Sequence, residues 1–511
     1  MEPNRFQEQF DLIQQSYDEH RVRLVAGPSG TPEYLHRKGV VLIRTSDSRA
    51  ASRLLARAGL NPVERSDDES TRLTTFSFAD PSRPADPAER WHDPVVSDAI
   101  DLLLAQNIPA ERDYLLTIAD VNCCPADEPV PVYDGTHNPG IPVTRPNYGT
   151  APVRVLVIDT GLVPGYDTHP TLASAVKKPT GKLGSDERSP MDTQNVLRQY
   201  VGHGTFIAGL IAAVAHNVEI TVRNCFSNAG ASGQHALGAD LNGILDEFRQ
   251  LPKEEWPDII SLSSGTPVAC DELTRLRSGR RSNTLPAQPL LALEEFMNRL
   301  AALKDLEDVK ERKEILLVAA AGNNGSDQRF YPAAWADSPK YGDFVVSVGA
   351  LRADGRDAAC FSNHGGWVSV FAPGEHLIST FTQKGVQTAY DYQHSTFGEC
   401  RYHQSYVCTC LSPPHIGELS QNRPFETWDL ATDRRLKRVH FDGLAEWSGT
   451  SFSTPLVAAM IANVMCEHKL TSHAAAAHLL NTTAKPATLR GRPAKIVEPA
   501  GWRPSMVYPS T

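Results

Sequence analysis

The sequence lacks the long apolar runs of a membrane protein and the basic charge balance of a nucleic-acid-binding protein. None of its apolar stretches approaches the length needed to cross a bilayer, and its polar first residues contain no apolar segment of the kind found in secretory signals. Its 60 Asp and Glu residues outnumber its 50 Lys and Arg residues, and there is no long basic stripe. We therefore expect neither a membrane nor a nucleic-acid partner.

Cysteine is too sparse and too scattered to form a disulfide framework. The chain has 9 cysteines, an odd number, spread over 511 residues, which is typical of a cytoplasmic protein with mostly reduced thiols. One polar segment contains Cys400, His403, Cys408, Cys410 and His415, and a zinc site there is an alternative to ordinary loop thiols. Because the spacing fits no strong zinc pattern, no metal ligand is assigned.

The first 122 residues have the pattern of a small α/β unit. Helical spacing is found at Arg5–Val25, Ser46–Leu60 and Ser97–Gln106, and strand-like patterns at Gly39–Arg44 and Thr71–Phe78. The next segment, residues 123–152, is rich in Pro, Gly, Asn and Asp and is predicted to be a linker. We therefore expect a small N-terminal α/β domain that is separate from the rest of the chain.

Residues 153–485 have the pattern of a larger α/β domain. Short apolar runs stand at Val153–Ile158, Val218–Val222, Ile259–Leu262, Ile315–Ala321, Phe344–Val348 and Trp367–Phe371, with helical segments between them. Runs that are apolar throughout indicate strands buried on both faces, so we predict a mostly parallel central sheet with helices on both faces. Stretches near 271–312 and 382–444 are predicted insertions, and residues 486–511 are predicted to be an irregular C-terminal tail.

A carboxylate follows the first of these apolar runs, in Asp159-Thr160-Gly161. An Asp in such a place is often only a turn residue that caps a loop. The same three residues occur in aspartic peptidases, but those enzymes need two such carboxylates sharing one proton. The sequence has no second Asp-Thr-Gly or Asp-Ser-Gly, so that interpretation is poor.

Three further residues can serve a reaction at the same edge of the sheet. His203 lies between two glycines where an apolar helix begins, Ser451 lies where a later helix begins, and Asn323 directly follows a predicted strand. Each has a structural alternative: a His on the surface, a Ser that caps its helix and an Asn that forms a turn. Together with Asp159 they provide a nucleophile, a base, a carboxylate that orients the base, and an amide donor for an oxyanion.

This combination resembles the subtilase family of subtilisin-like serine peptidases, over roughly Val153–Ala484. The resemblance implies a subtilisin-like fold in which Asp159, His203 and Ser451 form the triad and Asn323 serves the oxyanion hole. The residues it implies for substrate binding are Ser261, Leu262, Ser263, Ser264, Gly265, Ala321 and Gly322. Calcium sites are common in the family, but no calcium ligand is assigned in this sequence and no other cofactor is expected.

The function implied by the resemblance is a serine endopeptidase that cuts polypeptide substrates through an acyl-enzyme. Residues 1–122 are then a pro- or regulatory domain that inhibits the site intramolecularly, with an unrelated docking domain as the alternative. For the whole chain, the alternative is a catalytically silent pseudo-peptidase that binds peptides. An α/β-hydrolase esterase is disfavoured, because Ser453 stands where the Gly-x-Ser-x-Gly pattern around Ser451 needs its second Gly.

Overall fold

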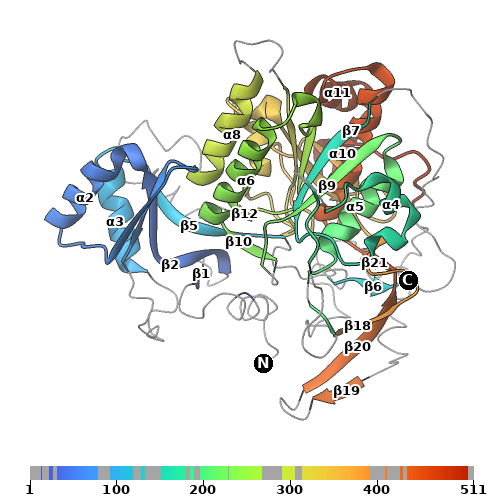
Figure 1. Ribbon diagram of the computed structural model, residues 1–511, viewed down its shortest axis with the longest axis horizontal. Coiled ribbons are helices and arrows are strands. Elements are labelled where there is room, and N and C mark those ends of the chain that lie inside the picture. Colours follow the sequence, from blue (N-terminus) through green and yellow to red (C-terminus); the bar gives the residue numbers. More distant parts are fainter. Residues whose placement is uncertain are drawn as a thin grey trace.

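The computed structural model describes most of both predicted parts of the chain (Figure 1). The described residues are 13, 22–26, 32–78, 93–118, 128–132, 151–179, 184–188, 196–198, 200–227, 230–267, 290–304, 313–391, 409–410, 426–429 and 434–504. Of the residues considered for zinc, only Cys410 is among them. Most of the helix predicted at residues 5–25 also lies outside the described residues.

The N-terminal domain is an antiparallel sheet with two helices on one face. Its strands are β1 (Val22–Ala26), β2 (Pro32–Arg44), β3 (Glu64–Asp68), β4 (Leu73–Ser77) and β5 (Ala110–Thr117), in the order β5-β2-β4-β3 with β1 beside β2. Helices α2 (Ser48–Arg57) and α3 (Pro94–Leu104) cover the face that buries Val41 and Ile43. Since side chains alternate along a strand, Val40 and Leu42 lie on the other face, where they pack on helix α8 (Leu291–Lys304).

The larger domain is built on an eight-stranded sheet with the order β22-β23-β16-β15-β13-β11-β7-β9. The strands are β7 (Val153–Asp159), β9 (Val218–Asn224), β11 (Ile259–Leu262), β13 (Leu316–Ala320), β15 (Val345–Leu351), β16 (Val370–Pro373), β22 (Lys485–Leu489) and β23 (Arg492–Ile496). All neighbouring pairs from β9 to β23 are parallel, and β22 pairs with β23 antiparallel. The predicted α/β class with a mostly parallel sheet is confirmed.

Helices cover both faces of this sheet, as strands that are apolar throughout require. Helices α5 (His203–Val214) and α10 (Thr450–His468) pack on the face that contains Val155 and Val157 of β7. Helices α6 (Gln234–Arg249) and α8 pack on the face that contains Leu156 and Ile158. The carboxyl ends of β7, β11 and β13 share one edge of the sheet, which is where sites form in folds of this kind.

Shorter elements complete the described part of the chain. They are helices α4 (Pro170–Ala175) and α11 (Ser472–His478) and strands β6 (Val130–Pro131), β8 (Val196–Leu197), β10 (Ala231–Gly233), β12 (Thr266–Pro267), β14 (Phe330–Tyr331), β17 (Leu377–Thr380), β18 (Gln387–Asp391), β19 (Glu426–Asp429), β20 (Arg434–Asp442) and β21 (Leu444–Trp447). Strands β18, β19 and β20 project from the lower side of the domain in Figure 1.

Several local expectations differ from the structure, because segments predicted to be helical or irregular pair as strands. Residues 22–25, predicted to end a helix, belong to β1, which pairs with β2. The predicted linker contributes β6, which pairs with β21. The predicted irregular tail instead contributes β22 and β23 to the edge of the main sheet. The partners of β6 and β23 lie far away in sequence, in β21 and β16, so local composition could not show these two pairings. Strands β1 and β22 pair with the strands that follow them, which the expected helix and the expected irregular tail did not anticipate.

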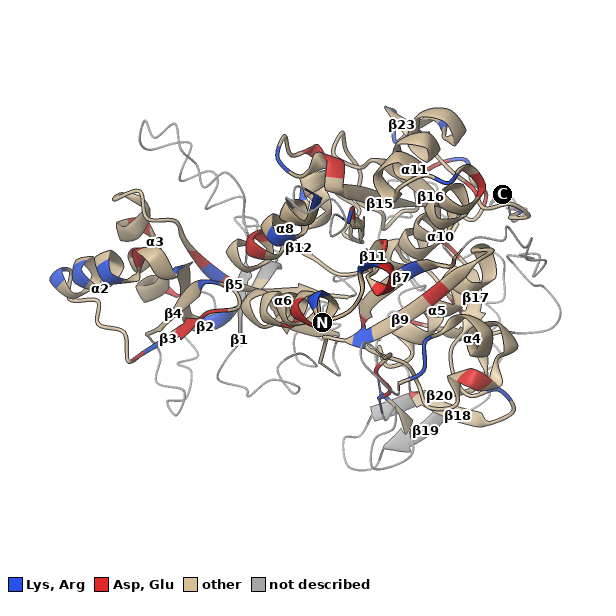
Figure 2. Ribbon diagram, turned by 45° about the horizontal axis from the view of Figure 1, so that its top comes forward, with Lys and Arg blue, Asp and Glu red and all other residues tan. Residues whose placement is uncertain are grey.

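Charge is mixed over the described surface, and its basic stripe is short. Arg49, Arg53 and Arg57 lie along the exposed side of α2, at the outer end of the N-terminal domain (Figure 2). Elsewhere along the described ribbon, acidic and basic residues are interspersed (Figure 2). No helix in the described part of the chain has both the length and the apolar character needed to cross a membrane.

Candidate active site

Asp159 is the last residue of β7, at the carboxyl edge of the parallel sheet. Its side chain is fully buried. The backbone N–H of Thr160 donates to Asp159 Oδ1 at 2.8 Å, and the Thr160 hydroxyl donates to the same oxygen at 3.1 Å. Because a buried carboxylate is costly unless it accepts hydrogen bonds, these two donors hold Asp159 in one orientation.

His203 is the first residue of α5 and faces this carboxylate. Its Nδ1 lies 2.9 Å from both Oδ1 and Oδ2 of Asp159, and the ring is 2% exposed. The preceding Gly202 has a φ of 97°, a left-handed conformation in which glycine is unstrained. A Cβ on Gly204 would lie 2.5 Å from the carbonyl oxygen of Gly161. The two glycines therefore allow the helix to begin close to the Asp159 turn.

Aromatic side chains pack around the imidazole of His203. The Trp447 ring meets it edge-on with centroids 5.2 Å apart, and the Phe452 ring lies at 5.1 Å. Phe206, one turn along α5, packs on both aromatic rings at 5.8 and 4.6 Å. This cluster limits the freedom of the ring and joins α5 to the start of α10.

Ser451 is the second residue of α10, and its hydroxyl contacts carbonyl groups rather than the histidine. Ser451 Oγ lies 3.2 Å from the carbonyl oxygen of Ile118 and 3.4 Å from that of Ser263, and its single proton is shared between these two acceptors. The structure gives no hydrogen bond between this hydroxyl and His203, although Phe452, the next residue, packs on the histidine ring. The Ser263 hydroxyl donates to the Ser451 carbonyl at 3.0 Å, which ties β11 to the start of the helix.

Asn323 follows β13 and is held by the same helix. Its Oδ1 accepts from the Thr450 backbone N–H at 2.9 Å and from the Thr450 hydroxyl at 2.8 Å. Because the oxygen is committed to these two donors, the amide nitrogen is directed away from Thr450. A Cβ on Gly449 would lie 3.7 Å from this nitrogen, so Nδ2 is beside the turn that carries Ser451.

The predicted substrate-binding residues fall into three different environments. Ser261 and Leu262 are the last two residues of β11, which is paired on both sides by β7 and β13, so they do not form an open edge. Ser264 is buried and its hydroxyl has no partner. Gly265 forms an antiparallel bridge with Thr117. Of this stretch, Ser263 and Gly265 are therefore the residues that meet the site.

Ala321 and Gly322 lie beside the turn that carries Ser451 instead of along an edge. The Gly322 backbone N–H donates to the Thr450 hydroxyl at 3.2 Å, and the Ala321 carbonyl accepts from the side chain of Asn363 at 2.9 Å. These bonds fix the position of the segment that carries Asn323.

No local sequence pattern predicts that the end of β5 lies in this site. Ile118 donates from its backbone N–H to the Gly230 carbonyl at 2.8 Å, and Leu115–Thr117 pair antiparallel with β10. On the opposite side, Thr117 N–H donates to Gly265 O at 3.0 Å and Gly265 N–H to Thr117 O at 3.2 Å. The only local signal for β10 is its small residues, between Gly230 and Gly233.

Two buried carboxylates attach β5 to the larger domain. Glu111 accepts from the backbone N–H groups of Leu290 and Leu291, at 3.0 and 2.5 Å, where α8 begins. Asp113 accepts from the backbone N–H of His235 at 3.1 Å, in the first turn of α6. A carboxylate at a helix N-terminus satisfies free amides and opposes the helix dipole. The N-terminal domain is therefore anchored on two helices beside the site.

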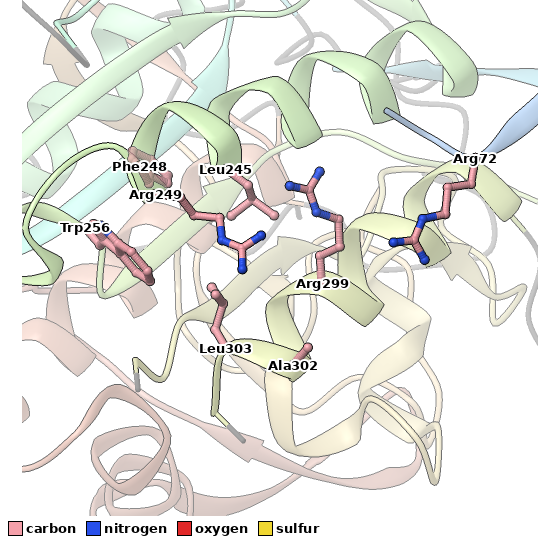
Figure 3. A pocket seen from close by; sticks show the side chains of 8 residues that line it. All are labelled: Arg72, Leu245, Phe248, Arg249, Trp256, Arg299, Ala302 and Leu303. Carbon is pink, nitrogen blue, oxygen red and sulfur yellow. The ribbon is translucent and has the colours of Figure 1, made fainter. Parts of the chain in front are cut away.

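A cavity of about 200 Å³ lies elsewhere, between α6 and α8 (Figure 3). Its lining residues are Arg72, Leu245, Phe248, Arg249, Trp256, Arg299, Ala302 and Leu303. The guanidinium of Arg299 pairs with Asp246, and that of Arg72 pairs with Glu295. No residue predicted for catalysis or substrate binding lines this cavity, so it is separate from the candidate active site.

The sequence pattern of the subtilase family matches residues 151–502. The chain belongs to the subtilase family. It is 30% identical to a thermophilic serine proteinase of Bacillus sp. (strain AK1) over 237 residues, and this aligned region covers 46% of this chain and 47% of that protein. It is 29% identical to an intracellular serine protease of Paenibacillus polymyxa over 242 residues, and this aligned region covers 45% of this chain and 58% of that protein. This subtilase thus spans about half the length of the curated relatives it matches.

Solved structures that resemble this subtilase include fervidolysin from Fervidobacterium pennivorans, a keratinolytic enzyme related to subtilisin. It matches with a TM-score of 0.48 and 16% identity over 94% of this chain and 63% of the other. A cold adapted subtilisin-like serine proteinase matches with a TM-score of 0.40 and 18% identity, over 75% of this chain and 96% of the other.

Proposed function

We propose that this subtilase is a serine endopeptidase in which Ser451 is the nucleophile, His203 the general base and Asp159 the carboxylate that orients the base. The observation that carries the proposal is that the buried Asp159–His203 pair lies beside a serine whose hydroxyl is 3.2 Å from the carbonyl oxygen of an extended peptide strand. Rotation of this hydroxyl toward His203 brings the nucleophile and the base together next to a peptide carbonyl, which is what acyl transfer needs.

In the proposed reaction, the Ser451 side chain first rotates from its carbonyl acceptors toward His203. Because Nδ1–H of His203 donates to Asp159, the lone pair is on Nε2, which accepts the serine proton as Oγ attacks the scissile carbonyl carbon. The imidazolium then returns this proton to the leaving amine. A water molecule hydrolyses the acyl-enzyme by the same route, and Asp159 stabilises the imidazolium in both halves.

The oxyanion of the tetrahedral intermediate is assigned to Asn323. Its Oδ1 is anchored by Thr450 and its Nδ2 is beside the Gly449 turn, so the donor is oriented before the charge develops. An oriented donor of this kind stabilises the transition state more than the substrate. Polypeptides are the proposed substrates, bound as an extended strand between β10 and Gly265.

We further propose that the N-terminal domain inhibits the site and is removed by self-cleavage at one of the two peptide bonds that follow Ile118. The support is the position of β5, which pairs with β10 and Gly265 where a substrate strand has to bind. The anchors at Glu111 and Asp113 hold this strand in place and exclude a second peptide.

Labelling with a fluorophosphonate tests the active site. We expect the processed protein to be labelled at Ser451, with no label in Ser451→Ala and very little in His203→Ala, while the exposed-residue control Ser174→Ala is labelled normally. No labelling of correctly folded protein from which the N-terminal domain has been removed by an added protease would instead favour the silent peptide-binding pseudo-peptidase. Intact mass measurement tests self-cleavage: the wild type loses its N-terminal domain and Ser451→Ala stays full length. If both stay full length while the wild type is active, self-cleavage is wrong.

Two expectations from the sequence, calcium binding and the cellular location, remain proposals. Calcium is implied by the family, but within the described residues no group of three or more His, Cys, Asp or Glu side chains is placed to hold a metal ion, and no step above uses one. An intracellular location is supported by the name of the Paenibacillus polymyxa relative. Fractionation of cells that express the full chain, with the Ser451→Ala variant to prevent processing, tests that location.

A further inference from the structure

A buried histidine outside the triad lies between two acceptors. His376 is 3% exposed. Its Nδ1 lies 2.7 Å from the carboxylate of Glu446, in β21, and its Nε2 lies 3.2 Å from the carbonyl oxygen of Thr409, in the predicted insertion. A carbonyl oxygen can only accept, and an ionised carboxylate can only accept. Both ring nitrogens therefore have to donate, which requires the doubly protonated imidazolium.

The charges around the ring favour this state. Burial lowers the pKa of His376, but the hydrogen bond and charge of Glu446, the charge of Glu375 and the Thr409 carbonyl together raise it to about 9. Glu375 is itself buried and accepts from the Thr409 hydroxyl and, at 2.9 Å, from the backbone N–H of Ala353. Two carboxylates thus surround one cation, and the insertion supplies the remaining acceptor.

Gly374 and His376 hold Ser448 and Gly449, which come shortly before Ser451 in the sequence. The His376 backbone N–H donates to the Ser448 hydroxyl at 2.8 Å, and the Gly449 N–H donates to the Gly374 carbonyl at 2.8 Å. His376 has a φ of 55°, which is unfavourable for a residue other than glycine and persists only where surrounding contacts impose it. The hydrogen bonds of the ring to Glu446 and Thr409 and of the backbone N–H to Ser448 surround this residue.

We propose that the doubly protonated His376, clamped by Glu446 and Thr409, is a positioning residue that fixes the Ser448–Gly449 turn and thereby the placement of Ser451. The inference rests on the proposed function of Ser451, because it concerns the orientation of that nucleophile. It also makes Thr409 part of the support of the active site. Loss of one ring proton removes one of the two clamping bonds, so the turn loosens when the ring is neutral.

The test compares His376→Gln and Glu446→Gln with the control His440→Gln, an exposed residue of neighbouring β20. In the processed wild type we expect kcat to fall as the pH rises through about 9 while KM changes less than twofold. His376→Gln is expected to lower kcat about tenfold at pH 7 and to abolish this alkaline decline. Glu446→Gln is expected to move the decline at least one pH unit lower, and the control to behave as wild type.

Ring protonation is measured separately, by NMR of ¹⁵N-histidine-labelled full-length Ser451→Ala protein; the signal is identified by its loss in His376→Gln or, should that variant not fold, by its shift in Glu446→Gln. We expect two protonated ring nitrogens at pH 7.5. A neutral ring at that pH overturns the proposal even if His376→Gln fails to fold. Wild-type kinetics in a folded His376→Gln also overturn it and leave the proposed function intact. A wild type that fluorophosphonate does not label overturns the proposed function instead, and the positioning role with it.

Discussion

We predict that the carboxylate of Glu111 holds the N-terminal domain against the site. The Glu111→Gln variant measures how much free energy this carboxylate contributes to the contact between the two domains. Glu111 is 8% exposed and accepts from the backbone N–H groups of Leu290 and Leu291 and from Gln234 Nε2, the last at 2.9 Å. In Glu111→Gln, the new NH₂ group faces donors and cannot accept. At least one charge-assisted hydrogen bond is lost, which costs about 1.5–3 kcal/mol.

The lost hydrogen bond makes separation of the two domains more frequent. At 1.36 kcal/mol per factor of ten, the open population rises roughly 10- to 100-fold. Hydrogen exchange in full-length Ser451→Ala protein measures it, because the amides of Ile118 and Gly265 are hydrogen-bonded across the contact and exchange only when it opens. Peptides containing these amides are expected to exchange faster by this factor in the Glu111→Gln variant.

The matched control is Glu64→Gln, which removes the same charge from an exposed position of β3. We expect it to leave the exchange of both peptides unchanged. If Glu111→Gln also changes exchange by less than threefold, the carboxylate does not anchor the domain. The same result would show that the hydrophobic contact of β2 with α8 is sufficient to hold β5 in the site.

Three further predictions follow from the site. Asn323→Leu should lower kcat about 10²–10³-fold with little change in KM, as expected when one oxyanion donor is removed; an equal rise in KM would argue for a role in substrate binding. Gly204→Ala should reduce both kcat and thermal stability, because its Cβ meets the Gly161 carbonyl oxygen at 2.5 Å, whereas Gly243→Ala, with open space around it, should be neutral or stabilising by up to about 1 kcal/mol. The pKa of His376, raised from 6.5 to about 9 by folding, contributes about 3 kcal/mol that is fully present below pH 6.5 and lost as the pH rises through 9. Urea unfolding of Ser451→Ala with and without His376→Gln, at both ends of this pH range, measures it. The difference in unfolding free energy between the two proteins should shrink by that amount as the pH rises.

The sequence alone was sufficient for the fold class, because its apolar runs report burial directly. A strand such as Val153–Ile158 has apolar residues on both of its faces, and only a sheet covered by helices on both sides can bury them. The candidate residues Asp159, His203, Ser451 and Asn323 were also predictable, since each stands at a strand end or a helix start with a recognisable local pattern. Their roles remain predictions that the proposed experiments test.

Contacts between segments distant in sequence were decided only by the tertiary structure. Nothing local to Ile118 indicates that it lies against Ser451, 333 residues away. Its position depends on the pairing of β5 with β10 and Gly265, which are distant in sequence. The clamp on His376 likewise needs Glu446 and Thr409 to converge from separate segments. Local patterns report how a residue is buried, whereas partner identity depends on the folded path of the whole chain.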